Sequence, residues 1–318
     1  MNAFPLVVDT DPGVDDAFAL ALVAASPEAD LRAVTTVFGN VGLARTTDNA
    51  RRLLSLLGRS DVPVAAGAAR PLIHPQPGGA GSVHGEDGLG AQSSSLPRPS
   101  GSTERRGAVQ LIADVLRTSK QPVTIAAIGP LTNIALLLAA YPELKPRINR
   151  LVVMGGGFQQ GNVGDGAEFN LWCDPEAAHR VLAEEDVPTT LVPLDLTMSC
   201  LVEPGWIQAL RVQSSTGARL AAMTAPVSRF YRERHGIEQI ALHDAVALLE
   251  ALQPGTLACK RQHVDIDTSQ GPKRGAIVQH RRKQAVQVTR MGREVDVATD
   301  GDLDRVRATL LARLSSLP

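Results

Sequence analysis

Apolar and polar positions alternate along the chain in a pattern typical of an α/β protein. Short runs rich in Val, Ile, Leu and Ala are separated by longer stretches with helical periodicity. Because strands that alternate with helices form βαβ units, the pattern predicts a mostly parallel (mixed) central sheet with helices on both faces. The expected strands are 6–8, 31–37, 62–65, 123–128, 151–154 and 189–194, with further short strands beyond 255. The expected helices are 15–25, 44–57 and 302–314, and two more that begin near 131 and 175.

Length and composition favour one folding unit. The chain has 318 residues, of which 44% are hydrophobic, so it can bury a large core. No internal repeat or shift in composition marks a boundary, and we expect a single domain over residues 1–318. Residues 71–104 are rich in Gly, Ser and Pro without clear periodicity, which is typical of a functional lid or of disorder. His84 lies in the middle of this segment.

Charge and cysteine content narrow the classes of partner. A net charge of −1 gives no overall field that would favour nucleic acid or an anionic membrane. The three cysteines are scattered and form no CxxC pair, which fits a reducing compartment. The sequence begins without a signal-peptide pattern, and no apolar stretch is long enough to span a bilayer. We therefore expect a cytoplasmic protein with a small-molecule substrate.

Four aspartates lie together in the string DTDPGVDDA. Asp9, Asp11, Asp15 and Asp16 follow the first apolar run directly, which places them at the carboxyl end of the first strand. Open α/β sheets bind their ligands at this edge. Carboxylates this close repel one another unless a positive charge lies among them, and a hard divalent cation prefers such oxygen ligands. The cluster therefore predicts a metal or acid–base site.

Two structural alternatives to this metal site carry less weight. Helix capping explains Asp15 or Asp16, because aspartate is favoured at the first turn of a helix, but it does not explain the other two aspartates. An EF-hand loop needs glycine and glutamate where this chain has Val14 and Leu20.

Two further segments carry candidate chemistry. Asn162, Glu168 and Asn170 follow a strand in the glycine-rich loop after residue 154, and their polar groups suit a polyhydroxy ligand such as a sugar. The alternative is a glycine-rich turn whose polar groups bond within the loop. His243 and Asp244 begin a helix in ALHDAVALL. In one interpretation His243 donates a proton and Asp244 binds a metal. In the other, Asp244 is the N-cap of the helix and His243 has no special role.

Three weaker signals complete the set. Asn40 follows the second strand at the same sheet edge as the aspartates. Tyr231 either lines a pocket or packs in the core. The basic run 273–283 is most simply a solvated hairpin.

The motifs together resemble a known family, the inosine–uridine-type nucleoside hydrolases. The matching strings, in the family's order, are DTDPGVDDA, TTVFGN, HGEDG, IGPLTNIA, VVMGGGFQQGN, AEFN with DPEAA, DLT and HD. They extend from Val7 to about Asp244, and the region after Leu252 matches only loosely. The resemblance implies an open α/β nucleoside hydrolase fold. It also implies Ca²⁺-dependent hydrolysis of the N-glycosidic bond of ribonucleosides, in a homodimer or homotetramer.

The resemblance also implies roles for individual residues. Asp11 would be the general base that activates a metal-bound water. The metal would be held by Asp11, Asp16, Asp244 and the backbone carbonyl of Ile128. Asp9 would support the cluster from behind, and His243 would stand near the leaving base. The substrate would be contacted by Asp15, Asn40, His84, Met154, Asn162, Glu168, Phe169, Asn170 and Tyr231.

Two departures and two rival functions remain. Two positions depart from the family pattern. Some relatives have threonine where this chain has Ile128, and some have histidine where it has Met198. A phosphatase of the haloacid-dehalogenase type also has a D-x-D motif after its first strand. It usually has Thr or Val where this chain has Gly13. The other rival is a non-catalytic nucleoside or ribose-binding protein. The sequence does not fix the preferred nucleobase, which depends on lid and helix residues such as Tyr231 and His235.

Overall fold

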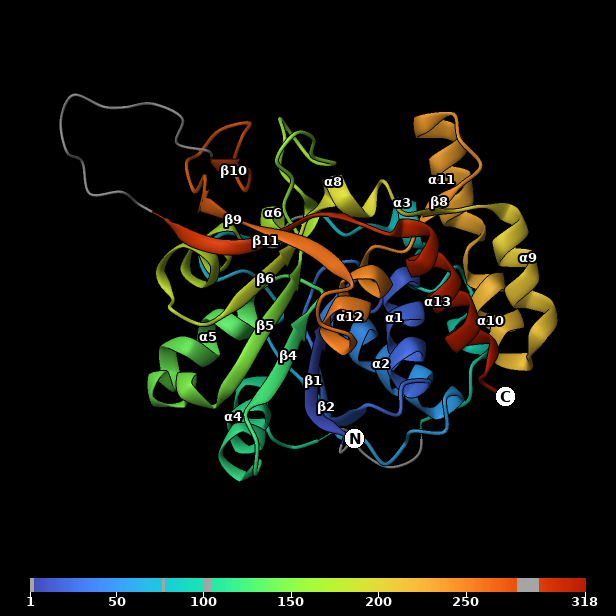
Figure 1. Ribbon diagram of the computed structural model, residues 1–318, viewed down its shortest axis with the longest axis horizontal. Coiled ribbons are helices and arrows are strands. Elements are labelled where there is room, and N and C mark those ends of the chain that lie inside the picture. The colour runs from blue at the N-terminus through green and yellow to red at the C-terminus, as the bar shows by residue number, and fades with distance from the viewer. Residues whose placement is uncertain (1–2, 76–77, 100–103, 279–291) are drawn as a thin grey trace.

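The computed structural model describes residues 3–75, 78–99, 104–278 and 292–318. Within these ranges a nine-stranded sheet forms the centre of the molecule, in the order β10-β9-β11-β6-β5-β4-β1-β2-β3 (Figure 1). The strands are β1 (Phe4–Thr10), β2 (Ala29–Thr36), β3 (Val64–Ala66), β4 (Val123–Ala127), β5 (Ile148–Met154), β6 (Thr189–Val192), β9 (Leu257–Ile266), β10 (Ile277–Val278) and β11 (Arg293–Gly301). A separate pair joins β7 (Leu201–Val202) to β8 (Ile240–Ala241).

The first strand lies at the point where the strand order reverses. β1 pairs in parallel with β2 on one side and with β4 on the other. In chain order, β2 and β3 lie on one side of β1, and the next strands, β4, β5 and β6, lie on its other side. The connecting loops therefore leave in opposite directions above the carboxyl ends of β1 and β4, and such a crevice is where open α/β sheets bind ligands.

The sheet is buried on both faces, as the sequence predicts. Leu6 and Val8 belong to one hydrophobic cluster, while Val7 between them belongs to the other. Val152 and Val153 of β5 divide in the same way. Because successive side chains of a strand point to opposite faces, each strand contributes to two cores at once.

Helices cover the two faces of the sheet (Figure 1). One face packs against α4 (Ala108–Thr118), α5 (Thr132–Ala140), α7 (Pro175–His179) and the π-helical turn Arg180–Glu184. The other face packs against α1 (Val14–Ala24), α2 (Leu43–Leu56), α12 (His243–Leu252) and α13 (Leu303–Ser315). A group beyond α1 comprises α9 (Pro204–Gln213), α10 (Ser215–Met223) and α11 (Ala225–His235). The remaining short helices are α3 (Gly81–His84), α6 (Phe169–Cys173), α8 (Leu194–Thr197) and the 3₁₀ turns Ser93–Ser95 and Pro142–Arg147.

The structure confirms the predicted α/β class and shifts some element ends. The strand expected over 189–194 ends at Val192, because Pro193 follows and α8 begins at Leu194. The strand expected over 62–65 begins only at Val64, after Pro63. Along the described ranges, no helix is long and apolar enough to cross a bilayer.

The long polar segment 71–104 is joined to the rest of the fold by hydrogen bonds around residues 84–87. The Asn49 side chain of α2 donates to the Asp87 carbonyl at 2.8 Å, and Arg45 donates to the Glu86 carbonyl at 2.8 Å. The short helix α3 ends at His84, which faces the start of α1. The described part of this segment therefore forms a fixed wall beside the sheet edge.

The basic run 273–283 differs from a solvated hairpin at Arg274. Its guanidinium donates to both carboxylate oxygens of Glu176, at 2.7 and 2.6 Å, and its side chain is only 14% exposed. Residues 279–283 of the run lie outside the described residues.

Candidate active site

A cavity of about 510 Å³ opens at the carboxyl edge of the sheet. Its size falls in the range of small-molecule sites. Twelve residues expected from the sequence line it: Asp15, Asn40, His84, Ile128, Met154, Asn162, Glu168, Phe169, Asn170, Tyr231, His243 and Asp244. They come from six or more separate elements, so only the tertiary fold brings them together.

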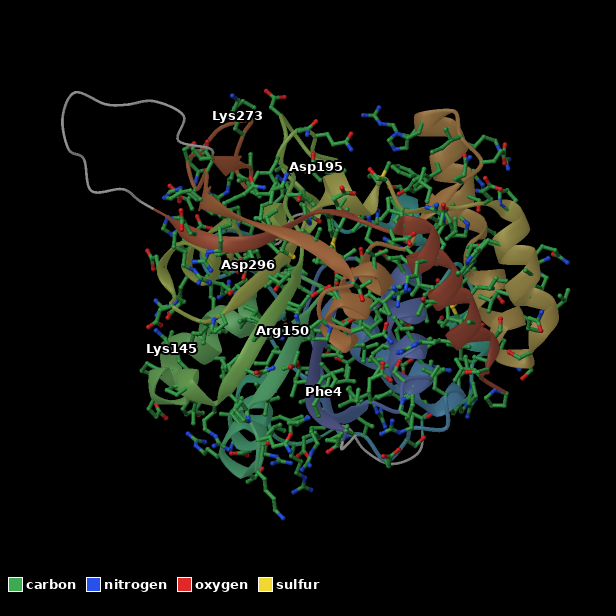
Figure 2. All side chains as sticks on the ribbon, in the orientation of Figure 1. Phe4, Lys145, Arg150, Asp195, Lys273 and Asp296 are labelled. Atoms are coloured by element: carbon green, nitrogen blue, oxygen red, sulfur yellow. The ribbon has the colours of Figure 1, made fainter. Side chains whose placement is uncertain are left out.

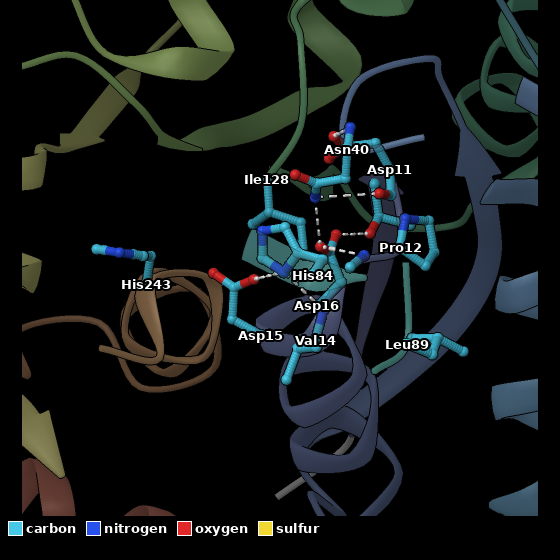
Figure 3. Close-up of polar contacts among 12 residues, drawn as sticks. Asp11, Pro12, Val14, Asp15, Asp16, Asn40, His84, Leu89, Ile128 and His243 are labelled. Atoms are coloured by element: carbon cyan, nitrogen blue, oxygen red, sulfur yellow. Dashed lines mark hydrogen bonds and ion pairs between the residues drawn. The ribbon is translucent and has the colours of Figure 1, made fainter. Parts of the chain in front are cut away.

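The turn between β1 and α1 sets the position of the aspartates. Asp16 accepts a hydrogen bond from the Gly13 amide at 2.8 Å and another from the Thr10 hydroxyl. This contact closes the first turn of α1 and fixes the Asp16 carboxylate at the helix start. A Cβ on Gly13 would lie 2.7 Å from the Asn40 side-chain nitrogen, so the turn needs glycine there. Figure 3 shows the aspartates and Asn40 gathered around this turn.

Three carboxylates converge from two distant segments. Asp15 and Asp16 of α1 and Asp244 of α12 each offer an oxygen, and these atoms lie within 4.8 Å of one another. Burial, followed by the charges of Asp15 and Asp16, raises the pKa of Asp244 well above its usual value. Burial also raises the pKa of the other two carboxyls. A bound cation would relieve this repulsion, so the donor set fits a hard divalent metal.

Asp244 does not cap its helix. The N-cap position of α12 is Leu242, and Asp244 lies in the first turn, with its side chain among the other carboxylates. The alternative reading of HD as a helix cap is therefore wrong.

Asp11 lies beside this group and has one oxygen without a partner. Its Oδ2 accepts a hydrogen bond from the backbone amide of Asn40 at 2.7 Å, while the buried Oδ1 has no hydrogen-bond partner among the described residues. A Cβ on Gly129 would lie 2.5 Å from Oδ1, and one on Gly39 would lie 2.0 Å from Oδ2. The two glycines thus let the backbone close around this carboxylate. Burial, then the charge of Asp16, raises the pKa of Asp11 well above its usual value.

Asp9, near the end of β1, links this strand to its neighbours through hydrogen bonds. Its Oδ1 accepts from the Thr35 hydroxyl at 2.5 Å and from the Asn133 side chain at 2.8 Å. The side chain is fully buried, and burial raises the pKa of Asp9 to about 7. It is not among the residues that line the cavity.

The glycine-rich loop after β5 forms the opposite wall. Glu168 caps α6 by accepting from the amides of Asn170 and Leu171, and it also accepts from Gly156 at 2.9 Å. The Asn170 side chain donates to the carbonyls of Ile128 at 3.2 Å and Met154 at 3.3 Å. Glu168 therefore has a structural role in addition to any contact with substrate.

Two histidines border the cavity with different partners. The Nδ1 atom of His243 lies 2.7 Å from the Thr197 hydroxyl, and its Nε2 lies 3.1 Å from the Tyr231 hydroxyl. His84 accepts from the Val14 amide through Nδ1 at 3.1 Å, so its neutral ring carries the proton on Nε2. Burial lowers the pKa of His243 and lowers that of His84 to about 4. Figure 3 shows the two rings on opposite sides of Asp15.

Sequence reasoning did not assign several residues of this site. Thr197 and Asn133, which contact His243 and Asp9, lie in the family strings DLT and IGPLTNIA, which mark these segments without giving either residue a role. The cavity is also lined by Gln160, Trp172, Val227, Phe230 and Arg234. Gln160 lies in the loop after β5, and the spacing of the other four on α6 and α11 does not distinguish a cavity wall from an ordinary helix face.

Fold and site together define a hydrolase of nucleosides, and comparison with known proteins supports this class. The profile of the inosine-uridine preferring nucleoside hydrolases matches residues 6–308. The pyrimidine-specific ribonucleoside hydrolase RihA of Salmonella enteritidis is 39% identical over 271 residues, which cover 84% of this chain and 85% of that protein. RihA of Klebsiella pneumoniae matches to the same extent. The chain belongs to the inosine-uridine preferring nucleoside hydrolase family.

Solved structures show the same architecture. A plant nucleoside hydrolase, PpNRh1, superimposes with a TM-score of 0.91 at 29% identity, over 98% of this chain and 99% of that one. The purine-preferring ribonucleoside hydrolase from Gardnerella vaginalis gives a TM-score of 0.88 at 28% identity, over 98% of both chains. The predicted open α/β fold is therefore confirmed.

Proposed function

We propose that this ribonucleoside hydrolase cleaves the N-glycosidic bond to ribose and free base with Ca²⁺ as its metal and Asp11 as its base. One observation carries the proposal. Three buried carboxylates from α1 and α12 meet next to a nucleoside-sized cavity, which Asp15 and Asp244 line. Beside them is a buried oxygen of Asp11 that has no partner among the described residues.

The metal would be held by oxygen ligands alone. Asp16 and Asp244, the Ile128 carbonyl and Asp11 are the ligands we propose, and an Asp15 oxygen lies in the same carboxylate group. An all-oxygen set with several carboxylates suits Ca²⁺ better than a softer metal. When bound, the cation lowers the pKa of a coordinated water and fixes the ribose through two hydroxyls.

Asp11 is placed to remove the proton from the attacking water. Its Oδ2 is held in one orientation by the backbone amide of Asn40, and its Oδ1, which has no partner among the described residues, can accept the proton. The water oxygen adds to the anomeric carbon while the bond to the base breaks. The departing electron pair goes to the base nitrogen.

Positive charge develops on the ribose as this bond breaks. The nearby carboxylates and amide oxygens stabilise that charge in a buried setting. The proposed ribose contacts are Asp15, Asn40, Met154, Asn162, Glu168 and Asn170, all of which line the cavity.

The leaving base must be protonated or depart as an anion. We propose His243 as the proton donor, with the Tyr231 hydroxyl bonded to its Nε2. His84 and Phe169 line the same cavity and would contact the base. Purines would need the proton more than pyrimidines, because pyrimidines depart with less help.

The rival functions fit the geometry less well. In a phosphatase of the haloacid-dehalogenase type the first aspartate is the nucleophile, yet the Oδ1 atom of Asp9 already accepts hydrogen bonds from Thr35 and Asn133. A reducing-sugar assay over purine and pyrimidine nucleosides, with and without a chelator, tests the proposal. Metal-dependent release of ribose supports it. Tight binding without release of base would indicate a nucleoside-binding protein.

We also propose a single domain over residues 1–318, assembled as a homodimer or homotetramer in the cytoplasm. Contacts between α1 and α12, which both supply metal-site carboxylates, support one folding unit. A single cooperative unfolding transition and light scattering would test these two points. Cell fractionation would test the location.

A further inference from the structure

Helix α11 presents one continuous face to the cavity. Five of its residues line the cavity: Val227, Phe230, Tyr231, Arg234 and His235. Their spacing of three, one, three and one follows a single stripe of an α-helix. Two observations therefore place Arg234 on the cavity face of α11. It lines the cavity, and its spacing puts it on the same helix face as the other four residues.

The aromatic residues of this stripe pack against one another. The rings of Tyr231 and His235 are 5.3 Å apart, and Phe230 lies 6.0 and 6.1 Å from them. Their mutual contacts fix the stripe as a wall that a flat ligand can pack against. Arg234 is the only residue of the five that is always charged.

Arg234 differs from its neighbour Arg232 in its partners. Arg232 donates to both oxygens of Glu238, at 2.8 and 2.9 Å. Among the residues that the structure describes, no hydrogen bond or ion pair occupies the Arg234 guanidinium. The side chain is exposed at the cavity, so its five N–H donors are available to a ligand.

The position of the carboxylates orients a nucleoside in the cavity. The ribose would lie over Asp15, Asp16 and Asp244, because in the described part of the chain this is the carboxylate group that could hold a metal and, through it, the sugar hydroxyls. Tyr231 contacts His243, and both lie near Asp15. Arg234 follows Tyr231 by three residues, which is about 4.5 Å along the helix axis. Tyr231 is buried whereas Arg234 is exposed, so Arg234 lies nearer the mouth of the cavity, toward the edge of the base away from the sugar.

We propose that Arg234 determines which bases are accepted, by donating hydrogen bonds to a carbonyl oxygen on the base edge away from the ribose. This inference rests on the proposed function. Uracil and hypoxanthine carry such a carbonyl, while cytosine and adenine carry an amino group in its place. Arginine has only hydrogen-bond donors, so it can donate to the carbonyl oxygen but cannot accept from the amino group. Uridine and inosine are the substrates that Arg234 favours over cytidine and adenosine.

The test compares matched pairs of substrates. The kcat/KM ratios of uridine to cytidine and of inosine to adenosine are measured for the full-length enzyme and its variants. Because each variant is compared with the wild type, the intrinsic difference between leaving groups cancels. In Arg234→Ala both ratios should fall about tenfold, the effect of one charge-assisted hydrogen bond. In Arg234→Glu, whose carboxylate accepts from amino groups, cytidine and adenosine should gain further.

Arg232→Ala is the matched control. It removes an arginine from the same helix that is paired with Glu238, and both ratios should stay at the wild-type value. The inference is overturned if Arg234→Ala hydrolyses all four nucleosides with unchanged ratios, which leaves the proposed function intact. It is also overturned if uridine 5′-monophosphate is the better substrate in an Arg234-dependent way, because Arg234 would then bind phosphate. Absence of hydrolysis of every nucleoside by the wild type would overturn the proposed function itself.

Discussion

Asp16 and Asp244 offer carboxylate oxygens within 4.8 Å of each other, although one lies in the first turn of α1 and the other in the first turn of α12. If they hold the metal, Asp16→Asn or Asp244→Asn should lower kcat/KM more than about 100-fold, because even the groups that orient a metal ligand contribute 10–100-fold. Calorimetric titration with Ca²⁺ should show weakened binding in the same variants. Asp186→Asn, which changes a surface aspartate 84% exposed, is the control and should behave as the wild type.

The buried carboxylates make the metal-free protein sensitive to pH. Burial raises the pKa of Asp9 to about 7 and also raises those of Asp11, Asp15, Asp16 and Asp244. Each folded-state pKa exceeds the unfolded value near 4, so the folded protein binds more protons in between. The contribution of these carboxylates to stability without metal should therefore be largest in acid and fall as the pH rises through the folded-state values.

A bound cation should offset this loss, because it stabilises the charged carboxylates. Thermal melting with and without a chelator between pH 5 and pH 8 measures the effect. We expect the drop in Tm caused by the chelator to grow with pH. A drop that is the same at every pH would contradict the assignment of these aspartates to a metal site.

Asp11 should matter for turnover more than for binding. Asp11→Asn keeps an oxygen that can accept from the Asn40 amide, so the turn should hold its shape. Loss of the base should reduce kcat by about 10²–10⁴-fold, while the affinity for nucleoside changes little. Single-turnover kinetics and equilibrium binding separate the two effects. Retained turnover would remove Asp11 as the base.

His243 should act on the leaving base. His243→Ala should slow inosine hydrolysis about tenfold more than uridine hydrolysis, because purine departure depends more on a proton. Thr197→Val removes the hydroxyl that contacts Nδ1 and should give a smaller effect of the same kind. Equal slowing of both nucleosides would argue that His243 only shapes the cavity.

The ion pair between Arg274 and Glu176 should order the wall that carries Asn162. The Pro272 carbonyl accepts from the Asp165 amide at 2.9 Å, so the segment around Arg274 contacts the loop that lines the cavity. Figure 2 shows Lys273 close to this part of the molecule. Arg274→Ala should destabilise the protein by about 1–3 kcal/mol and raise KM more than it lowers kcat.

The control for this pair is Arg261→Ala. Its partner is Asp296, and both side chains are exposed, at 62% and 46%. Its effect on the free energy of unfolding should stay within about 0.5 kcal/mol. The reversed pair, Arg274→Glu with Glu176→Arg, should recover part of the lost affinity if the ion pair itself orders the loop.

Several elements followed directly from local patterns in the sequence. The run 6–8 predicts β1, and the aspartates after it predict charge at the carboxyl edge of the sheet, because both depend on residues close together in the chain. The strand expected at 189–194 ends at Val192, because Pro193 has no N–H to donate to a neighbouring strand. Short helices such as α3 and α8 escaped prediction, since four residues are too few to show a periodicity.

By itself, the sequence determined the α/β class, the acidic site and, through its motifs, the nucleoside hydrolase family. Local periodicity and the order of motifs along one chain were sufficient for these conclusions. Only the tertiary structure decided that Asp244 meets Asp15 and Asp16, that Glu168 also caps a helix, and that Arg234 faces the cavity. These relations depend on the strand order and on how α11 and α12 pack, which are set by contacts between residues far apart in the chain.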